Sequence, residues 1–449
     1  MLLHFIIFCS ISYFQQIHGQ TYSVLQFGAI GNGKTDDTNA IRATLAAANN
    51  SNGGRVVFDS GYTFLSGCFN VTSNVILDVR GTILVPQNSS YFVPVPALPW
   101  MGGIPGWQSI VRSYNAQNIT ITGGGVIDGQ GSPWWDCARN NLSLPPCNGF
   151  NRPNLVQLYN TIDVVVYNIH LKDSPMWNLH LANTTNVHIY NVNITAPSDS
   201  HNTDGYDIDC SVNMLLENSF YNGGDDAIAV KSGIDYFGRT FGRTTANVII
   251  RNMTIGTSHG LSIGSEMSAG VRNVTFQNIT MNGSGAGPRI KSQRGRGGVV
   301  QDITYQDITL YNVDTAIDIT MNYSKKYIPP TNDTATPKFI NINIVNLHAE
   351  NSNYGWYLDG LPESAVNNTF LSNITLTNTK HLIQLCDYTY GICDNSTVLP
   401  YCPTCIQAEP CVDMSSDCTQ YLGQCSSPVY LFVENRVICA ILAKIVGLE

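Results

Sequence analysis

From about residue 118 onward, one alternating pattern of polar and apolar positions recurs along the chain. β-branched residues alternate with polar ones, an Asn or Asp interrupts the run, and a second short run follows, as in DVVVYNIHLKDS and NVIIRNMTIGTS. Strict alternation predicts β-strands with one face turned toward a core. The interrupting residues align at Asn168, Asn191, Asn218, Asn252, Asn278, Asp307, Asn346 and Asn373, at intervals of 23 to 39 residues.

Intervals of this size are typical of stacked repeats. Each repeat has too few strands to bury a face alone, whereas stacked coils bury the inward side chains and pair their backbones about 4.8 Å apart. The interrupting Asn falls at a bend, where its amide tolerates a turn conformation and bonds to its equivalents in neighbouring coils. The sequence therefore predicts an all-β fold, a single-stranded right-handed parallel β-helix. A β-propeller, the alternative, would show hairpin turns and longer periods.

The N-terminal part departs from this pattern. The segment SVLQFGAIGNGKTDDTNAIRATLAAANN predicts a strand, a Gly/Asp loop and an amphipathic helix. Thr38 is a favourable N-cap, and Ile41, Leu45 and Ala48 share one helical face. Because a terminal repeat must be capped, we expect this helix to close the N-terminal end of the core. We expect the cysteine-rich tail to cover the other end.

Composition narrows the class of protein. The 449 residues are 43% hydrophobic and 12% charged, against about 25% charged residues in a typical globular domain. This balance excludes a disordered chain and a membrane bundle. The net charge of −9 argues against a nucleic-acid binder, which needs a strongly basic face. An anionic substrate held by a few local cations is still allowed.

The start of the chain and its sequons indicate secretion. Residues 2–14 are apolar but too short to span a bilayer easily, and a polar stretch ending in Gly19 follows. We therefore expect a signal peptide at 1–19, with a buried N-terminal strand as the alternative. Asn-x-Ser/Thr sequons, which accept N-glycans, are frequent. They include Asn70, Asn118, Asn193, Asn252, Asn278 and Asn373.

The cysteines support the same compartment. Loss of Cys9 with the signal peptide would leave an even number, which is compatible with disulfides. Cys137 and Cys147 bracket a short loop and form a natural pair. Cys386 and the cysteines from 393 to 425 predict a disulfide-linked tail at 386–449, although the CxxC of YCPTC leaves a zinc site as an alternative. The β-helix is expected at 20–385.

Four short motifs interrupt the monotony of the coils. They are Asn202-Thr203-Asp204-Gly205, Gly224-Asp225-Asp226, His259-Gly260 and Arg289-Ile290-Lys291. Each alone is more often a turn, core or surface feature. Successive motifs are 21 to 33 residues apart, one coil each when a loop at 233–245 is allowed for. Because residues one coil apart share a face, we expect carboxylates, an imidazole and two cations in one column.

Such a column suits glycoside hydrolysis. One carboxylic acid protonates the leaving oxygen while a carboxylate polarises water. Like charges on neighbouring coils raise one pKa, so that a proton is available, and His259 can tune it. Arg289 and Lys291, with Arg294 and Arg296, form the one basic cluster of an acidic chain. A guanidinium fork fits the carboxylate of a uronate sugar.

In this order and spacing, NTD, DD, HG and RIK resemble the motifs of the polygalacturonase family, glycoside hydrolase family 28, whose members are right-handed β-helices that cleave pectin. The resemblance covers roughly residues 22–385 and includes the opening FGAIGNGKTDDTNAI. It implies hydrolysis of α-1,4-galacturonosyl linkages with inversion at the anomeric carbon. Segment 233–245 and the RGRGG extension look more like the exo-acting or plant-type branch, in which a loop that blocks one end of the groove would impose exo action.

The same resemblance implies roles for individual residues. Asp225 corresponds to the general acid, Asp204 and Asp226 to the residues that activate water, and His259 to the residue that supports the acid. Galacturonate binding falls to Arg289, Lys291 and Tyr323, and Asn202 helps to shape the site.

Two geometric questions accompany these roles. Stacked coils place carboxylates about 5 Å apart, a separation usual in retaining enzymes, whereas the resemblance implies inversion. Adjacent Asp225 and Asp226 can both face the site only through a bulge, since strand neighbours point to opposite faces.

Alternatives to this hydrolase remain on sequence grounds. A pectate or rhamnogalacturonan lyase would need a Ca²⁺-binding carboxylate cluster and an Arg base. A rhamnogalacturonan-type hydrolase or a non-catalytic, pectin-binding β-helix would share the fold. We expect no cofactor and no metal, an anionic polysaccharide (pectin or polygalacturonate) as partner, no nucleic-acid or membrane partner, a monomer, and a secreted protein of the extracellular space or cell wall.

Overall fold

The computed structural model describes residues 19–324, 335–406, 431–433 and 436–438. Nearly all of the expected signal peptide and the cysteines 411, 418 and 425 lie outside the described residues. The chain divides into two units, 1–407 and 408–449. In the second, the described residues form one antiparallel pair, β31 (Leu431–Val433) with β32 (Arg436–Ile438). The first unit holds the site and is described below.

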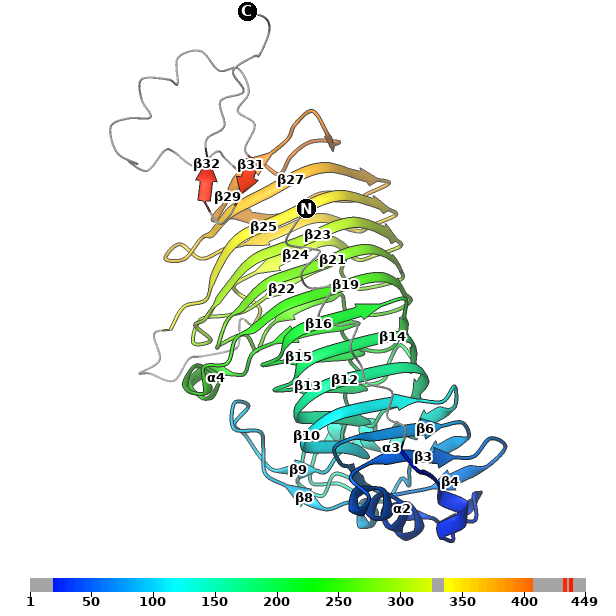
Figure 1. Ribbon diagram of the computed structural model, residues 1–449. Helices are drawn as coiled ribbons and strands as arrows, with labels where there is room; N and C mark the ends of the chain where they lie inside the picture. Colours follow the sequence, from blue (N-terminus) through cyan, green and yellow to red (C-terminus); the bar gives the residue numbers. More distant parts are fainter. Residues whose placement is uncertain (1–18, 325–334, 407–430, 434–435, 439–449) are drawn as a thin grey trace, which may run out of the picture. The chain divides into compact units, whose positions relative to one another are not determined.

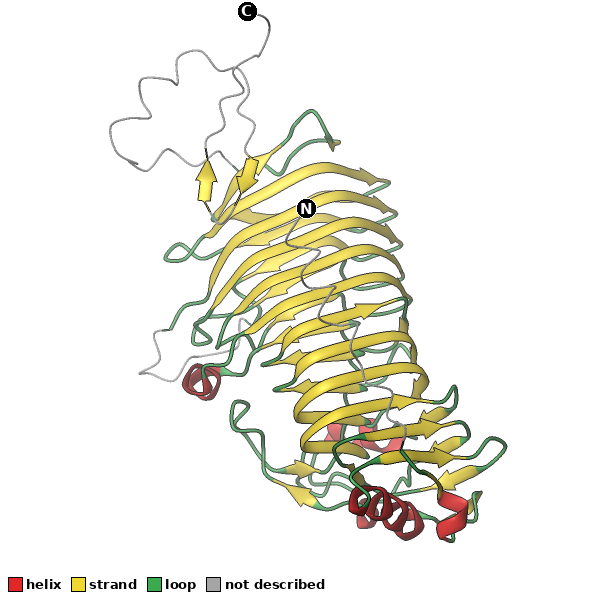
Figure 2. Ribbon diagram, viewed as in Figure 1, coloured by secondary structure: helices red, strands yellow, loops and turns green. Residues whose placement is uncertain are grey.

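Parallel strands wind through the first unit as a right-handed β-helix (Figures 1 and 2). The long strands form two bent faces: β10 (Val111–Thr122), β12 (Val156–Lys172), β14 (Thr185–Thr195), β16 (Val212–Glu217), β17 (Phe220–Asn222), β19 (Thr245–Ile255), β21 (Val271–Asn282), β23 (Val299–Tyr311), β25 (Lys338–Glu350) and β27 (Val366–Thr377). The short strands form the third face: β13 (Leu179–Ala182), β15 (Tyr206–Asp209), β18 (Ile228–Lys231), β20 (Leu261–Gly264), β22 (Pro288–Lys291), β24 (Thr315–Thr320), β26 (Tyr354–Asp359) and β28 (His381–Asp387). The predicted fold class is confirmed.

Shorter elements complete the first unit. Those before β10 are β1 (Thr21–Ser23), η1 (Val24–Phe27), β2 (Asn32–Asp36), α2 (Thr38–Asn50), β3 (Gly54–Phe58), β4 (Thr63–Leu65), β5 (Phe69–Val71), β6 (Val75–Val79), β7 (Thr82–Leu84), η2 (Ser89–Tyr91), β8 (Pro94–Val95) and β9 (Gly106–Trp107). Between long strands lie β11 (Val126–Asp128), α3 (Ser132–Asn140) and α4 (Asp235–Phe241), and β28 is followed by β29 (Thr389–Cys393) and β30 (Val398–Leu399). No helix among the described residues is long and apolar enough to cross a membrane.

The interrupting residues stand at a bend of each coil, as predicted. All eight adopt left-handed backbone conformations, with φ between 48° and 58°. Asn tolerates this conformation better than most residues. Its amide also bonds between coils: Nδ2 of Asn252 donates to Oδ1 of Asn218 at 3.0 Å, and Nδ2 of Asn278 donates to Oδ1 of Asn252 at 2.9 Å. We call these eight positions the Asn ladder.

Helix α2 closes the N-terminal end through its predicted face, because Ile41, Leu45 and Ala48 are all buried in the core. The predicted N-cap is wrong by one residue. Asp37 occupies the cap position, and Thr38 is the first helical residue. Thr38 Oγ1 is engaged elsewhere: it accepts from the amide of Gly67 at 2.9 Å and donates to Asp36.

The sheet continues past the boundary expected at residue 385. Strand β28 spans this position, and β29 and β30 both pair with β27. Disulfides join Cys386 to Cys405 and Cys393 to Cys402, and the predicted pair Cys137–Cys147 is present. Because both cysteines of YCPTC are in disulfides, the zinc alternative is wrong. Cys68 and Cys210 are buried thiols without a disulfide.

Candidate active site

The outward side chains of the short strands align from coil to coil in two columns. Each short strand is one rung, and the register runs His180, Asp207, Ala229, Ser262, Arg289 and Asp318 in one column. The other column includes Ala182, Asp209 and Lys231, followed by Gly264, Lys291 and Thr320. Asp204, Asp225, Asp226 and His259 lie in the turns that enter β15, β18 and β20. The predicted column is therefore present.

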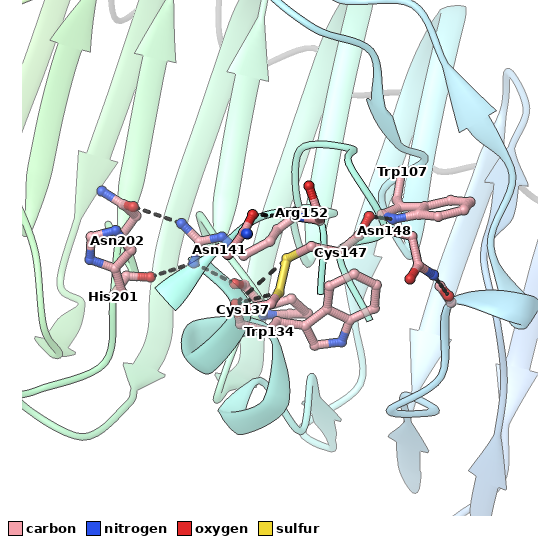
Figure 3. The surroundings of a disulfide bond; sticks show 12 residues. Trp107, Trp134, Cys137, Asn141, Cys147, Asn148, Arg152, His201 and Asn202 are labelled. Atoms are coloured by element: carbon pink, nitrogen blue, oxygen red, sulfur yellow. Dashed lines mark hydrogen bonds between the residues drawn. A yellow bond between two sulfur atoms is a disulfide. The ribbon is translucent and has the colours of Figure 1, made fainter. Parts of the chain in front are cut away.

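Asp225 is held by residues from three coils. Nδ1 of His259 lies 2.9 Å from Oδ1 of Asp225, and Nδ2 of Asn202 donates to Oδ2 at 3.1 Å. Asn202 is positioned in turn by Arg152, whose Nη2 donates to Oδ1 of Asn202 at 2.6 Å while Nη1 donates to the carbonyls of Pro175 and His201. Figure 3 shows Arg152 between Asn202 and the Cys137–Cys147 disulfide. Sequence reasoning missed Arg152.

Asp226 is surrounded by cations. Its Oδ2 accepts from Nζ of Lys291 at 2.6 Å, and its Oδ1 accepts from Oγ of Ser262 at 2.7 Å. Nη1 of Arg289 lies 3.4 Å from the same Oδ1. The Tyr323 ring centroid lies 5.5 Å from Cζ of Arg289 and 5.0 Å from Nζ of Lys291. The two predicted cations and the predicted tyrosine thus lie together, next to Asp226.

Asp204 belongs to a buried cluster that sequence reasoning also missed. Its Oδ2 lies 3.9 Å from Nζ of Lys231, which is 3.0 Å from Oδ1 of Asp207 and 3.7 Å from Oε2 of Glu266. The ammonium also lies 3.9 Å from the ring centroid of Trp177. The signal was available: Lys231 and Glu266 are charged residues at the ends of apolar strands, one coil apart.

Burial and charge shift the pKa values of Asp204, Asp225 and His259 in different directions. Burial alone would raise the pKa of Asp225, but the hydrogen bond and charge of His259, together with Lys291, hold it well below its usual value. The same hydrogen bond raises the pKa of His259. Burial and the charges of Asp225 and Asp207 raise the pKa of Asp204 well above its usual value. Asp204 is therefore the carboxyl group with the raised pKa that was expected from like charges. The proton of the Asp225–His259 pair lies on the imidazole.

Local backbone geometry explains how adjacent Asp225 and Asp226 both reach the site. The two residues lie between β17 and β18, in a turn where strand alternation does not apply. The bulge expected at this point is therefore not needed. The glycine of His259-Gly260 has a φ of 148°, and a Cβ there would lie 3.2 Å from the Gly287 carbonyl oxygen. The HG motif thus keeps neighbouring coils close together.

The predicted basic cluster divides into two parts. Arg289 and Lys291 face Asp226, whereas Arg294 pairs with Glu363 at 2.5 Å and Arg296 with Asp235 at 2.5 Å. Arg294 and Arg296 are therefore engaged away from Asp226, because the chain turns out of the sheet after β22.

A metal ion does not suit the carboxylates of this site. One potential ligand atom from each of Asp225, Asp226 and His259 lies within 4.8 Å of the others. The oxygens of Asp226, however, already accept from two cationic side chains, and Asp225 is paired with His259. Two cations at contact distance oppose a third positive charge.

The fold is a parallel β-helix, and one of its faces carries three neighbouring carboxylates, an imidazole and two cations. Together, this fold and this site chemistry are those of a carbohydrate-cleaving β-helix. The comparisons agree: residues 103–395 match the family described as Glycosyl hydrolases family 28. The chain belongs to this family and is a glycoside hydrolase.

Individual relatives support this assignment. A probable polygalacturonase of Vitis vinifera is 31% identical over 393 residues, which cover 84% of this chain and 79% of the relative. An exopolygalacturonase from Thermotoga maritima superposes with a TM-score of 0.75 and 28% identity, over 85% of this chain and 92% of that structure. A polygalacturonase from Erwinia carotovora gives a TM-score of 0.63 and 26% identity, over 86% and 97%.

Proposed function

We propose that this protein hydrolyses the α-1,4-galacturonosyl bonds of polygalacturonate and pectin, with inversion at the anomeric carbon. The observation that carries this proposal is the stack of Asp204, Asp225, Asp226 and His259 beside Arg289 and Lys291. The relatives named above as polygalacturonases support the substrate. Two partly buried cations and an aromatic ring beside the acids match a sugar that carries a carboxylate.

In this proposal Asp225 passes a proton to the leaving oxygen. His259 holds this proton at Nδ1, 2.9 Å from Oδ1 of Asp225, and passes it to Asp225 as Asp225 protonates the leaving oxygen. Asn202, fixed by Arg152, orients the other oxygen of Asp225. A carboxylate that receives its proton from a neighbouring imidazole can act as a general acid although its own pKa is low.

Asp226 and Asp204 act on water. Lys291 and Arg289 hold Asp226 as an anion that orients and polarises the water. With both of its oxygens occupied by hydrogen bonds, Asp226 is a poor nucleophile, which favours inversion over a covalent intermediate. The charge of Lys231, 3.9 Å from Oδ2 of Asp204, favours the ionised form of this carboxyl group. In that form the raised pKa makes Asp204 a stronger base than an ordinary carboxylate, suited to accept the proton that the water loses.

Replacement of the acid tests the function directly. We expect Asp225→Asn to lower kcat on polygalacturonate by about 10² or more, because a positioned general acid contributes about 10²–10⁴-fold. The dissociation constant for galacturonate oligomers should change only a few-fold. Asp136→Asn, on the exposed surface of α3, is the matched control and should keep wild-type turnover.

Further readouts separate the alternatives. Proton NMR of the first wild-type product should show the β-anomer. No release of reducing ends from polygalacturonate would leave a non-catalytic, pectin-binding β-helix, whereas an ultraviolet-absorbing unsaturated product would identify a lyase. Release of reducing ends from rhamnogalacturonan, and not from polygalacturonate, would identify a rhamnogalacturonan-type hydrolase.

Location and assembly complete the proposal. We propose that the protein is secreted, with a signal peptide at 1–19, and acts as a monomer in the extracellular space or cell wall. Three disulfides among the described residues support an oxidising compartment.

A further inference from the structure

A pocket of about 620 Å³ lies at the bend of the long strands, away from the short strands that carry the catalytic residues. Its lining includes Arg55, Asp78, Gly124, Tyr167, His170 and Asn193. We call it the bend pocket. It spans the coils from β3 to β14 (Figure 1) and includes two residues of the Asn ladder, Asn168 and Asn191. In the coil of the catalytic turn, ladder residue Asn218 and Asp225 lie on opposite sides of β17 along the chain. The bend pocket is therefore separate from the catalytic turns.

The pocket exists because glycines take the place of a ladder residue in one coil. Between β10 and β11 the chain turns through Gly123 and Gly124, which have φ values of 127° and 77°. The amide of Gly124 donates to the carbonyl of Asn168 at 2.6 Å, so Gly124 lies one coil before this ladder residue. A Cβ at Gly124 would have no atom within 4 Å beyond its neighbours in the chain. Open space thus stands where other coils carry an amide side chain.

The Asn ladder is interrupted at the same place. In later coils the ladder amides bond to one another, as Asn252 does to Asn218. The side-chain amides of Asn168 and Asn191, which are neighbours in register, make no hydrogen bond with any residue that the structure describes. Both residues are exposed. Each amide can therefore donate to and accept from a ligand in the pocket.

An aromatic ring and a neutral imidazole complete a lining that suits a sugar. Tyr167 stacks on Tyr190, with the ring centroids 4.9 Å apart and the planes 7° apart, so its ring is held in place. His170 shares a hydrogen bond of 2.7 Å with Oγ1 of Thr195 through Nε2. Burial and the charge of Lys172 lower the pKa of His170, so the imidazole is neutral at pH 7. Aromatic rings with a few polar groups are typical of ligand pockets of this volume.

Arg55 provides the pocket with a cation. Its Nη1 lies 2.7 Å from Oδ2 of Asp78, and Nη2 of Arg80 lies 2.7 Å from the same oxygen. Because two guanidinium groups share this carboxylate, Asp78 neutralises Arg55 only in part. Nε and Nη2 of Arg55 donate to no residue that the structure describes, and the side chain is 37% exposed. These two nitrogens form a fork that fits a carboxylate.

We propose that the bend pocket is a second binding site for the carboxylate-bearing polysaccharide, which holds a segment of the chain without cleaving it. The choice of this ligand rests on the proposed function. Arg55 binds the carboxylate of one sugar, the ring of Tyr167 packs against a sugar face, and the amides of Asn168 and Asn191 bond to hydroxyl groups. The catalytic acids Asp204, Asp225 and Asp226 are not among the residues that line this pocket, so the bound segment stays intact.

Calorimetric titration of the Asp225→Asn variant with trigalacturonate tests this proposal. We expect two binding sites per chain, one at the catalytic turns and one in the bend pocket. Because Asn193 stands in a sequon, the protein is produced in a host that adds no N-glycans. Binding of a single trigalacturonate would overturn the proposal.

A glycine substitution assigns the second site to the bend pocket. In the Asp225→Asn background, Gly124→Asn puts an amide into the open space, and Asn tolerates positive φ. It should weaken the second site about tenfold or more, a loss of about 1.4 kcal/mol of binding free energy, while the first site keeps its dissociation constant. Gly61→Asn is the matched control, because Gly61 has a φ of 83°, equally open space and no place in the pocket. It should keep both sites.

Arg55→Gln tests the carboxylate contact and serves should Gly124→Asn fold poorly. Asp78 keeps its ion pair with Arg80 in this variant. Trigalacturonate should bind the second site several-fold more weakly, whereas its methyl ester, which lacks the charges, should bind as it does without the substitution. An unchanged second site in a folded Gly124→Asn variant or in Arg55→Gln would overturn the proposal. The proposed function fails separately, if the wild-type protein releases no reducing ends from polygalacturonate.

Discussion

At the scale of single residues, the Asp225–His259 pair is the centre of the site. The two residues are 34 positions apart in the chain, yet their side chains lie 2.9 Å apart because consecutive coils superimpose. The hydrogen bond raises the pKa of His259 and helps to hold that of Asp225 down, so the pair carries one proton until the imidazole loses it. As the pH rises through the raised pKa of His259, this proton is lost, and activity should fall.

Replacement of His259 should therefore move the basic limb of the pH profile. In His259→Gln the proton can reside only on Asp225, so the basic limb of kcat/KM should shift to lower pH by about one unit or more, toward the range of a carboxyl group. His381→Gln, on β28, is a matched control and should leave the profile unchanged. A basic limb that stays in place in His259→Gln would show that this histidine does not store the catalytic proton.

The residues that sequence spacing predicted and those that it missed differ in kind. The motifs at 202–204, 225–226, 259 and 289–291 were detectable because chemically distinctive residues recur once per coil. Arg152 was not, since it acts from a connecting segment whose path the coil period does not determine. The pKa order of Asp204 and Asp225 was also beyond the sequence, because it depends on which carboxylate the imidazole contacts.

At the scale of elements, the Asn ladder shows why alternation predicted the strands so directly. Inward positions of successive coils pack on one another, and the ladder fixes the bend between them. The predicted cap of α2 and the predicted bulge were wrong for a shared reason. Both depended on one or two residues in a turn, where a side chain such as that of Thr38 can form a hydrogen bond with a residue far along the chain.

Substitutions at Asn278 separate the two contributions of the ladder. Asn278→Gly removes the amide bond to Asn252 but keeps the left-handed backbone accessible, whereas Asn278→Ala loses both. We expect Asn278→Ala to be less stable than Asn278→Gly by about 1 kcal/mol, the approximate penalty for a non-glycine residue in this conformation. Denaturant unfolding of the three proteins gives the comparison. Equal stabilities of the two variants would mean that the bend imposes no conformational demand.

At the scale of the whole molecule, each coil contacts mainly the coils next to it, so damage at one end stays local. The disulfides Cys386–Cys405 and Cys393–Cys402 fasten the last described coils, far along the chain from the catalytic turns. The Cys137–Cys147 disulfide lies instead beside Arg152, which positions Asn202 (Figure 3). The disulfides are therefore expected to have different consequences when removed.

A pair of double variants tests this difference. Cys393→Ala/Cys402→Ala should speed limited proteolysis between 386 and 406 several-fold while kcat/KM stays close to wild type, because a closed loop restrains mainly the local segment. Cys137→Ala/Cys147→Ala should lower kcat/KM, because the segment that leads to Arg152 loses its covalent support. Loss of activity in the first variant with none in the second would contradict this arrangement.

The register between coils has a consequence for how such an enzyme can diversify. Hydrogen bonds between strands, not the number of residues between motifs, set the distance from the proton donor to the water-binding carboxylates. Connecting segments such as 85–110 and 232–244 can therefore lengthen, shrink or be exchanged while the reacting groups keep their geometry. Descendants of one ancestral solenoid could acquire new product lengths through changes in these connecting segments. Protein engineers can graft the same segments without redesigning the residues that carry out the reaction.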